Sequence, residues 1–336
     1  MNIDSAREIE REPHGSSDDA DLLDFSANTN PTVPVGVEDV YHEAFEESRT
    51  YPEEPPSHYR QTAAAYVGCQ PDRVIPTPGG LAAIRLTIAL TVDPGDSVLV
   101  PAPSFGEYAR EIRLQSGTPV FEPQGEILEA DPTEHALAIV CNPNNPTGNA
   151  YDPTALADFA RRCRQASTVL LVDEAFLGFT PYPSLAGTEG TVVARSLTKL
   201  FGLPGIRAGF AVASGELRDA LVAARRTWNV SRPALATGTF CMRQDEFVAE
   251  TRQRVERERE RMRETLAGHY GIRPSDSPFL LLDVGDRSVD CLIETARERG
   301  IVIRDARTFR GLDKHVRVAV RRPAENDRLL EVLLDV

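Results

Sequence analysis

Lysine is almost absent from this chain. Lysine and arginine together number 37, and only Lys199 and Lys314 are lysines, so the other 35 are arginines. Lys199 lies within SLTKLFGLPGIRAGF (residues 196–210), among glycine, leucine and hydroxyl residues. An arginine guanidinium stays protonated in proteins, whereas a lysine amine can lose its proton and attack a carbonyl. Lys199 is therefore the first candidate for a reactive group.

Positive charge is also scarce overall. The chain has 51 acidic and 37 basic residues and a formal net charge of −14. Nucleic-acid binding requires a basic face, so this balance argues against a nucleic-acid partner. The acidic excess fits a halophile-like protein that stays soluble in concentrated salt. The alternative is a GC-rich genome, which favours arginine over lysine but does not explain the acidity.

Long apolar runs and clustered cysteines are missing too. No run approaches the ~18 apolar residues of a membrane helix, and the N-terminal MNIDSAREIEREPHG is too polar for a secretory signal. The five cysteines show no C-x-x-C spacing, and the six histidines are dispersed. This pattern predicts a cytoplasmic protein with free thiols, no membrane association and no metal site. The cysteines are Cys69, Cys141, Cys163, Cys241 and Cys291.

Short apolar runs alternate with helical patterns in the first two thirds of the chain. GLAAIRLTIALTV (80–92) places Leu81, Ile84 and Ile88 on one helix face, and residues 152–166 open with Asp and Pro, as helix starts often do. This alternation predicts an α/β fold with a mostly parallel sheet covered by helices. Ligands bind such sheets beyond the carboxyl ends of the strands. The predicted strands are residues 96–103, 135–143, 167–175, 191–199 and 207–214.

The last third has a different composition. Residues 245–267 are charged, contain no glycine or proline, and are expected to form a long helix between two domains. The remaining segments predict strand, helix, strand, strand and helix, which is a small α+β domain. The expected organisation is an N-terminal arm (1–41) that joins the small domain, a large domain (42–248) and the small C-terminal domain (249–336).

Polar groups follow the predicted strands. CNPNNPTG (141–148) is a rigid loop that can fix an asparagine amide, and Asp173 ends an apolar strand, where a buried carboxylate needs a positive partner. The turn PTPGG (76–80) opens a helix and offers N–H groups to an anion. With the amine, two hydroxyls and an arginine near residue 199, this set fits pyridoxal 5′-phosphate (PLP).

In their order and spacing, NPNNPTG, DEAF and SLTKLFGLPGIRAGF resemble fold-type I PLP-dependent enzymes of the class I/II aminotransferase family. The resemblance runs along nearly the whole chain and implies an aspartate-aminotransferase-like architecture with PLP as the cofactor. It implies Lys199 as the Schiff-base lysine, Asp173 as the partner of the pyridinium nitrogen, and Asn145 as the ligand of the phenolic oxygen.

The same resemblance implies contacts from elsewhere in the chain. Phe105 falls where the family stacks an aromatic ring on the cofactor. Tyr51 falls where a tyrosine reaches the cofactor phosphate of the neighbouring subunit, which implies a homodimer with shared active sites. Arg317 falls where an arginine binds the substrate α-carboxylate. The residues implied around the cofactor phosphate are Gly79, Gly80, Ser196, Thr198 and Arg207.

One position departs from the family. The fourth residue of DEAF is usually a tyrosine whose hydroxyl assists the asparagine at the phenolic oxygen, and here it is Phe176. Either Asn145 works alone at that oxygen or another donor compensates.

Three features resemble the threonine-phosphate decarboxylases of cobalamin biosynthesis more than their near cousins, the histidinol-phosphate aminotransferases. HGSSDDADLLDFSANTNP (14–31) has a His-Gly pair before DFSAN, although Ser16 replaces a second glycine. The other two features are the Phe of DEAF and the tail at 300–326, which contains R-D, G-L and RVAVR. The resemblance implies a lyase that decarboxylates L-threonine O-3-phosphate, a small phosphorylated amino acid, to (R)-1-amino-2-propanol phosphate.

On this interpretation His14, Asn30 and Arg321 are candidates for binding the substrate phosphate. Arg321 is preferred to Arg322 because it lies four residues after Arg317 on the same face of a strand. The alternative is an aminotransferase of the histidinol-phosphate type. A more remote alternative is a non-catalytic PLP-fold binding or regulatory protein, although no basic helix-turn-helix segment is present.

Overall fold

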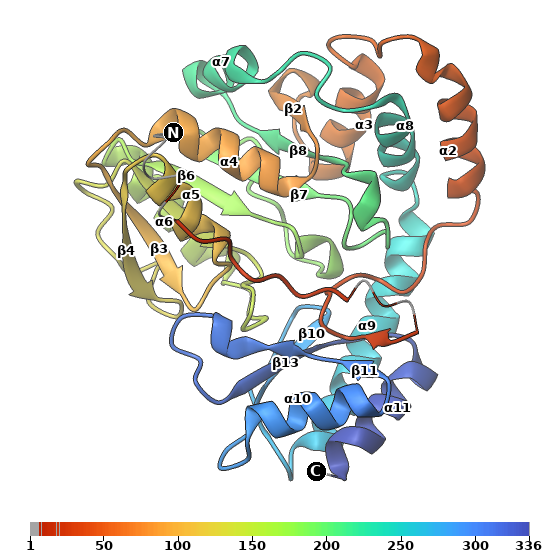
Figure 1. Ribbon diagram of the computed structural model, residues 1–336. Coiled ribbons are helices and arrows are strands. Elements are labelled where there is room, and N and C mark those ends of the chain that lie inside the picture. The colour runs from red at the N-terminus through yellow and green to blue at the C-terminus, as the bar shows by residue number, and fades with distance from the viewer. Residues whose placement is uncertain (1–6, 8, 18, 20, 336) are drawn as a thin grey trace.

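Two sheets and their helices form a larger and a smaller part of the molecule (Figure 1). The computed structural model describes residues 7, 9–17, 19 and 21–335. The larger part is built on a seven-stranded sheet of order β2-β8-β7-β6-β5-β3-β4. Its strands are β2 (Val74–Thr77), β3 (Ser97–Ala102), β4 (Thr118–Pro123), β5 (Leu137–Cys141), β6 (Val169–Asp173), β7 (Thr191–Ser196) and β8 (Gly209–Val212).

The sheet is mostly parallel, as predicted. Strand β3 pairs in parallel with β4 and β5, and the parallel ladder continues through β6 to β7. Only β8 runs antiparallel to its neighbours β7 and β2 within the described residues. Every residue of β5 is buried, because helices cover both faces of the sheet. The α/β fold class predicted from the sequence is confirmed.

Helices cover the two faces as separate layers. Ile84, Ile88 and Ile112 pack on one face, and Tyr59 and Phe159 pack on the other. In the described part of the chain, no helix is long and apolar enough to cross a membrane. The first layer contains α4 (Gly80–Thr91), α5 (Glu107–Leu114) and α7 (Gly215–Ala224). The second contains α3 (Ser57–Val67), α6 (Pro153–Gln165) and α8 (Arg232–Cys241), with α2 (Val37–Glu46) packed on α8.

Helix α9 (Asp245–Leu266) belongs to both parts. Its residues Val248 and Val255 pack in the larger core, whereas Met262 and Leu266 pack in the smaller one. The smaller part has a sheet of order β12-β13-β10-β9 and two covering helices. These elements are β9 (Gly271–Ile272), β10 (Phe279–Asp283), α10 (Val289–Glu298), β12 (Arg304–Asp305), β13 (His315–Ala319) and α11 (Pro323–Leu334).

The N-terminal segment crosses between the two parts and then joins the smaller one (Figure 1). Strand β1 (Leu23–Asp24) pairs in parallel with β11 (Ile301–Val302), and Phe25 is fully buried in the smaller core. The domain boundaries expected at 41/42 and 248/249 fall inside α2 and α9. Phe25 packs in the smaller core and Val37, the first residue of α2, packs in the larger one, so the chain passes to the larger core between these residues and returns to the smaller one within α9.

Candidate active site

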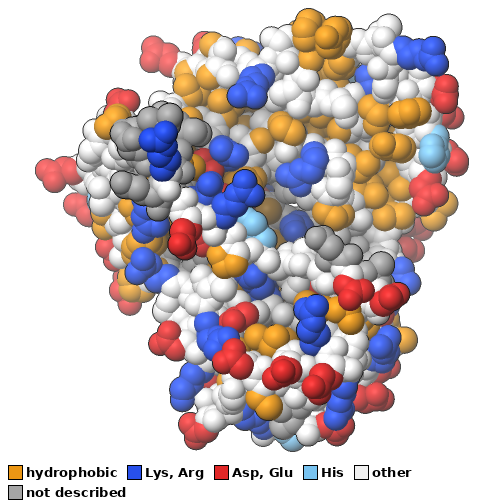
Figure 2. Space-filling model, in the orientation of Figure 1, with side chains coloured by type: hydrophobic (Ala, Val, Ile, Leu, Met, Phe, Trp, Pro, Cys, Tyr) orange, Lys and Arg blue, Asp and Glu red, His pale blue; other side chains and the backbone are white. Residues whose placement is uncertain are grey.

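A cavity of about 330 Å³ lies where the two parts meet. Three parallel strands end at it, because Cys141, Asp173 and Ser196 are the last residues of β5, β6 and β7 and all line the cavity. The N-terminal segment and β12 and β13 complete its walls. In Figure 2, Lys and Arg side chains and a histidine gather around the hollow in the middle of the face. The site thus lies beyond the carboxyl ends of the strands, as the sequence predicted.

Lys199 follows β7 and lines the cavity. Its carbonyl accepts a hydrogen bond of 3.0 Å from the backbone N–H of Asn30, which fixes the turn. Burial, reinforced by the nearby charges of Arg317 and Arg207, lowers the pKa of the Lys199 amine to about 8. A larger fraction of the amine is therefore neutral near pH 7 than for an exposed lysine, which favours nucleophilic attack.

Asp173 is buried at the end of β6. Its carboxylate accepts a hydrogen bond of 2.6 Å from the Tyr108 hydroxyl and one of 3.0 Å from the Ala175 N–H. Burial raises the pKa of Asp173, and the two hydrogen bonds oppose that change. A cationic partner within the cavity would further stabilise the ionised carboxylate. The sequence analysis missed Tyr108, although its place three residues after Phe105 was a signal that it belongs to the same wall.

An anion cradle surrounds the start of α4. Gly79 precedes the helix with φ of 88° and no side chain caps the helix N-terminus. That φ lies in the region that favours glycine, and a Cβ on Gly79 would also lie 2.7 Å from a guanidinium nitrogen of Arg207 and displace it. The Ser196 and Thr198 hydroxyls lie 2.8 Å apart on the opposite wall. Free N–H groups, two hydroxyls and a guanidinium form a phosphate site.

Asn145 and Arg317 are joined across the cavity. Nη1 of Arg317 donates to Asn145 Oδ1, and Nη2 donates to the Ser26 carbonyl at 2.9 Å. Because Arg317 donates to the amide oxygen of Asn145, the amide N–H groups of Asn145 are left to donate to a different group. Burial, and then the charge of Arg304, lowers the pKa of Arg317 to about 9. Phe176 lines the same corner with its ring 5.2 Å from that of Phe279 and offers no hydroxyl.

Arg304 is a second buried arginine of this cavity, and the sequence analysis missed it. It is the directly opposite partner of Arg317 across the β12–β13 ladder. Both guanidinium carbons lie 5.5 Å from the ring centroid of Phe309. Burial lowers the pKa of Arg304, against the attraction of Asp305 and Glu12. The R-D pair in the tail was noted in the sequence, but nothing local distinguished this arginine from the others.

His14 and Phe105 form the entrance from the N-terminal segment. Their ring centroids are 5.9 Å apart, and His14 Nε2 lies 3.2 Å from a carboxylate oxygen of Glu107. Both residues line the cavity, as expected for a substrate ligand and a ring-stacking residue. Gly15 is also required here, because a Cβ would lie 2.6 Å from the Ser26 carbonyl.

Asn30 and Arg321, predicted to bind substrate phosphate, do not line the cavity. The Asn30 amide donates to the Leu200 carbonyl at 2.7 Å and accepts from Arg254 at 2.6 Å. Arg321 donates to the Asp24 carbonyl and to Glu325. The prediction extended strand alternation from Arg317, but β13 ends at Ala319, so the same-face rule no longer applies.

Tyr51 also lies outside this chain's own cavity. It is 72% exposed and stacks on Trp228 with ring centroids 4.2 Å apart. Its expected role in a neighbouring subunit stays a prediction. The predicted residues that do line the cavity are Lys199, Asp173, Asn145, Gly80, Phe105, Ser196, Thr198, Arg207, Arg317 and His14.

Comparison with known proteins agrees with this geometry. The profile of the family described as "Aminotransferase class I and II" matches residues 20–333. The threonine-phosphate decarboxylase of Salmonella typhimurium is 30% identical over 94% of this chain and 91% of its own. Histidinol-phosphate aminotransferase 1 of Archaeoglobus fulgidus is 29% identical over 94% of this chain and 99% of its own. The structure of histidinol-phosphate aminotransferase from Sinorhizobium meliloti, in complex with PLP, covers 92% of this chain and 90% of its own with a TM-score of 0.81 and 21% identity.

The donor set of the cavity fits PLP, which is the cofactor of this protein. Asn28 Oδ1 is buried at the cavity without a hydrogen-bond partner among the described residues, so the site is built for a polar ligand. When bound, PLP supplies a carbonyl for an amine and an electron-accepting ring. Lys199 would hold its aldehyde carbon, Asp173 its ring nitrogen and Asn145 its phenolic oxygen. Gly80, Ser196, Thr198 and Arg207 would hold its phosphate, whereas Gly79, which was also predicted there, does not line the cavity and donates its N–H to the Thr77 carbonyl at 2.8 Å.

Attachment of PLP to Lys199 should depend on pH. The neutral amine is the nucleophile, so the rate of attachment to the apoprotein should rise about tenfold per pH unit below the Lys199 pKa and level off above it. That pKa is about 8. Stopped-flow absorbance of the yellow adduct between about pH 6 and about pH 10 measures this, with free ethanolamine as the reference for the titration of PLP itself.

Two variants control this experiment. Lys199→Ala should bind PLP reversibly without forming the yellow adduct. Lys314→Ala should behave like the wild type, because Lys314 is exposed and lies 3.6 Å from Asp286. A rate that keeps rising about tenfold per pH unit from about pH 8 to about pH 10 would contradict the assignment of a lowered pKa to Lys199.

Proposed function

The chain belongs to the aminotransferase class I and II family, and we propose that it decarboxylates L-threonine O-3-phosphate to (R)-1-amino-2-propanol phosphate in cobalamin biosynthesis. One observation carries this proposal. Arg304 and Arg317 are directly paired on neighbouring strands and both line one small cavity that also holds Lys199. The substrate has two anionic groups, a carboxylate and a phosphate, and the two arginines supply one guanidinium for each.

Arg317 suits the α-carboxylate. Its Nη1 already bonds Asn145, which places it beside the group expected at the cofactor phenolic oxygen. Its Nε is buried without a partner among the described residues, so a donor remains for a carboxylate oxygen. Arg304 lies toward the N-terminal segment, where it donates to the Pro13 carbonyl at 2.6 Å. That position, with His14 nearby, suits the substrate phosphate.

Holding both anions determines which bond breaks. In PLP chemistry the bond to Cα that stands perpendicular to the cofactor ring is the labile one. Arg304 and Arg317 together prevent rotation about the N–Cα bond, and so can set the carboxylate perpendicular to the ring. The Cα–CO₂ bond would then be the one to break, with CO₂ as the leaving group, its bonding electrons accepted by the bound cofactor and a proton delivered to Cα in place of the carboxylate. Lys199, with a pKa of about 8, can donate that proton near neutral pH.

The main alternative is an aminotransferase that acts on histidinol phosphate. The similarity to histidinol-phosphate aminotransferase 1 of Archaeoglobus fulgidus supports it, and its substrate also carries a phosphate that Arg304 could bind. It differs in the bond that must stand perpendicular to the ring, which is Cα–H. Two paired arginines in one small cavity suit a substrate that carries both a carboxylate and a phosphate, and this supports the decarboxylase.

The reaction can be tested directly. We expect the PLP-loaded protein to release one CO₂ for each amino alcohol phosphate formed from L-threonine O-3-phosphate, at a rate that does not change when 2-oxoglutarate is added. Mass spectrometry of the product and a coupled CO₂ assay measure both species, with Lys199→Ala as the inactive control. Transamination of imidazole-acetol phosphate by glutamate, with no CO₂ from threonine phosphate, would establish the alternative.

Arg304 and Arg321 make a matched pair for the phosphate contact. Arg304→Gln should lower kcat/KM for threonine phosphate by about ten- to a hundredfold, because a charge-assisted hydrogen bond is worth about 1.5–3 kcal/mol. Arg321→Gln should leave the preference for threonine phosphate over threonine unchanged, because its guanidinium bonds Asp24 and Glu325 outside the cavity. Steady-state kinetics with threonine phosphate and with threonine measures both effects. A loss of the preference for threonine phosphate in Arg321→Gln but not in Arg304→Gln would instead assign the substrate phosphate to Arg321.

The protein is also proposed to act as a homodimer in which each subunit lends Tyr51 to the other. Two large apolar side chains at α2 are exposed, with Val35 just before the helix at 95% and Phe45 near its end at 59% exposure. Figure 2 shows hydrophobic side chains gathered over this upper part of the molecule. Tyr51 and Trp228 stack without reaching their own cavity, which suits a contact with a second copy.

Shared sites can be detected by mixing variants. A hybrid of Lys199→Ala and Tyr51→Phe subunits contains one site with both native residues, so mixing two weakly active proteins should raise the activity. The gain is measured after subunit exchange, and each variant exchanged with itself is the control. Full activity in a species that sedimentation shows to be a monomer would rule out the shared site.

A further inference from the structure

The turn between β12 and β13 holds Arg304 in place. Asp305 begins a short helical turn (Ala306–Thr308) and its carboxylate accepts from the Arg307 N–H at 2.9 Å. The Thr308 hydroxyl donates to the Asp305 carbonyl at 3.1 Å, and the Phe309 N–H donates to the Ala306 carbonyl at 3.0 Å. The turn is therefore closed by its own hydrogen bonds.

Thr308 connects this turn to the cavity. Nη2 of Arg304 donates to the Thr308 hydroxyl at 2.9 Å, while that hydroxyl gives its own proton to the Asp305 carbonyl. A hydroxyl has one proton and two acceptor lone pairs, so Thr308 can make both bonds at once. Thr308 also lines the cavity itself. The Thr308 hydroxyl thus links the turn to the guanidinium end of the Arg304 side chain.

The same turn supports the other arginine. Phe309 follows Thr308 directly, and its ring centroid is 5.5 Å from the guanidinium carbons of both Arg304 and Arg317. An aromatic face attracts a cation, so the ring partly offsets the repulsion between the two arginines. A small change in the turn would therefore shift both anion-binding groups together.

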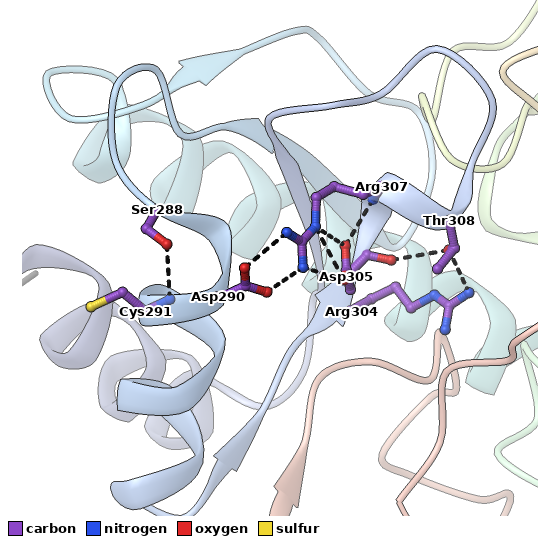
Figure 3. Close-up of polar contacts among 7 residues, drawn as sticks. All are labelled: Ser288, Asp290, Cys291, Arg304, Asp305, Arg307 and Thr308. Carbon is purple, nitrogen blue, oxygen red and sulfur yellow. Dashed lines mark hydrogen bonds and ion pairs between the residues drawn. The ribbon is translucent and has the colours of Figure 1, made fainter.

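Arg307 fixes the turn from the solvent side. Its Nε donates to Asp305 at 3.0 Å, and its Nη1 donates to Asp290 at 3.1 Å in the first turn of α10. Figure 3 shows the resulting chain of contacts from Arg304 through Thr308, Asp305 and Arg307 to Asp290. Exposed ion pairs are individually weak. Arg307, however, bonds two carboxylates, Asp305 in the turn and Asp290 in α10, and so joins the turn to that helix.

We propose that Thr308 is a positioning residue for Arg304, and that its hydroxyl sets the affinity of the cavity for the phosphate group of the substrate. This inference rests on the proposed function in so far as it assigns the phosphate to Arg304. An Arg304 guanidinium that is held on one edge by Thr308 and the Pro13 carbonyl presents its remaining N–H groups to the cavity. Without the hydroxyl, the side chain gains rotamers and must be ordered again at each binding event.

The test uses the PLP-saturated protein and two substitutions at one position. Thr308→Val keeps the shape and removes the hydroxyl, and should weaken the binding of inorganic phosphate by about tenfold, the scale of one lost hydrogen bond. Thr308→Ser restores the hydroxyl and should recover most of the affinity. Titration calorimetry gives Kd for inorganic phosphate, and kinetics gives the ratio of kcat/KM for threonine phosphate to that for threonine.

A double-mutant cycle separates positioning from general damage. In the Arg304→Gln background, Thr308→Val should change the Kd for phosphate by less than about twofold, because the residue it positions is gone. Thr265→Val is the matched control, since the Thr265 hydroxyl is exposed and bonds only the Arg261 carbonyl within α9. Should Thr308→Val not fold, Asp290→Asn loosens the turn from the surface and should give a smaller loss in the same direction.

The outcomes separate this proposal from the proposed function. If threonine phosphate is not decarboxylated but Thr308→Val still weakens phosphate binding, the function is wrong and the role of Thr308 stands. Equal phosphate affinity in Thr308→Val and the wild type, or an equal loss in the Arg304→Gln background, would falsify the positioning role.

Discussion

The structure depends on collecting positive charge in one cavity of an otherwise acidic protein. Lys199, Arg207, Arg304 and Arg317 all line it, within a chain whose formal charge is −14. Burial and mutual repulsion lower the pKa of Lys199 to about 8 and that of Arg317 to about 9. Such a cluster is stable only when anions balance it. The phosphate of PLP would supply part of that balance, and the proposed substrate would supply a carboxylate and a phosphate.

The architecture brings these charges together from separate elements. The parallel strands β5, β6 and β7 end at one edge and deliver the groups for the cofactor. The smaller sheet delivers Arg304 and Arg317, the two arginines proposed to bind the substrate, from β12 and β13. Helix α9 packs in both cores, and the N-terminal segment passes the entrance at His14 and is then anchored in the smaller core by Phe25. Because the arginines and the lysine belong to different cores, their spacing depends on how the two parts pack.

Motif residues could be predicted because their local chemistry is distinctive. An isolated lysine, an aspartate at the end of an apolar strand and a glycine turn at a helix start each have a physical reason for being there. No distinctive local chemistry in the sequence around Arg304 or Tyr108 indicated that these residues belong to the site. Arg304 is one of 35 arginines, and Tyr108 is a buried aromatic residue whose hydroxyl meets Asp173 only in the folded state. Arg321 was assigned to the site because strand alternation was extended past the end of β13, and Asn30 was assigned to it from the resemblance of residues 14–31.

The sequence by itself determined the α/β class, the mostly parallel sheet, the bridging helix and the cofactor-binding residues. These follow from hydrophobic periodicity and from short motifs, which are properties of residues close in the chain. Only the tertiary structure decided which arginines line the cavity, that Tyr108 donates to Asp173, and that Arg304 donates to Thr308. Those facts depend on strand ends, register and packing between distant segments. Side-chain contacts across a sheet or between two cores are fixed by the backbone around them, and no local pattern specifies them.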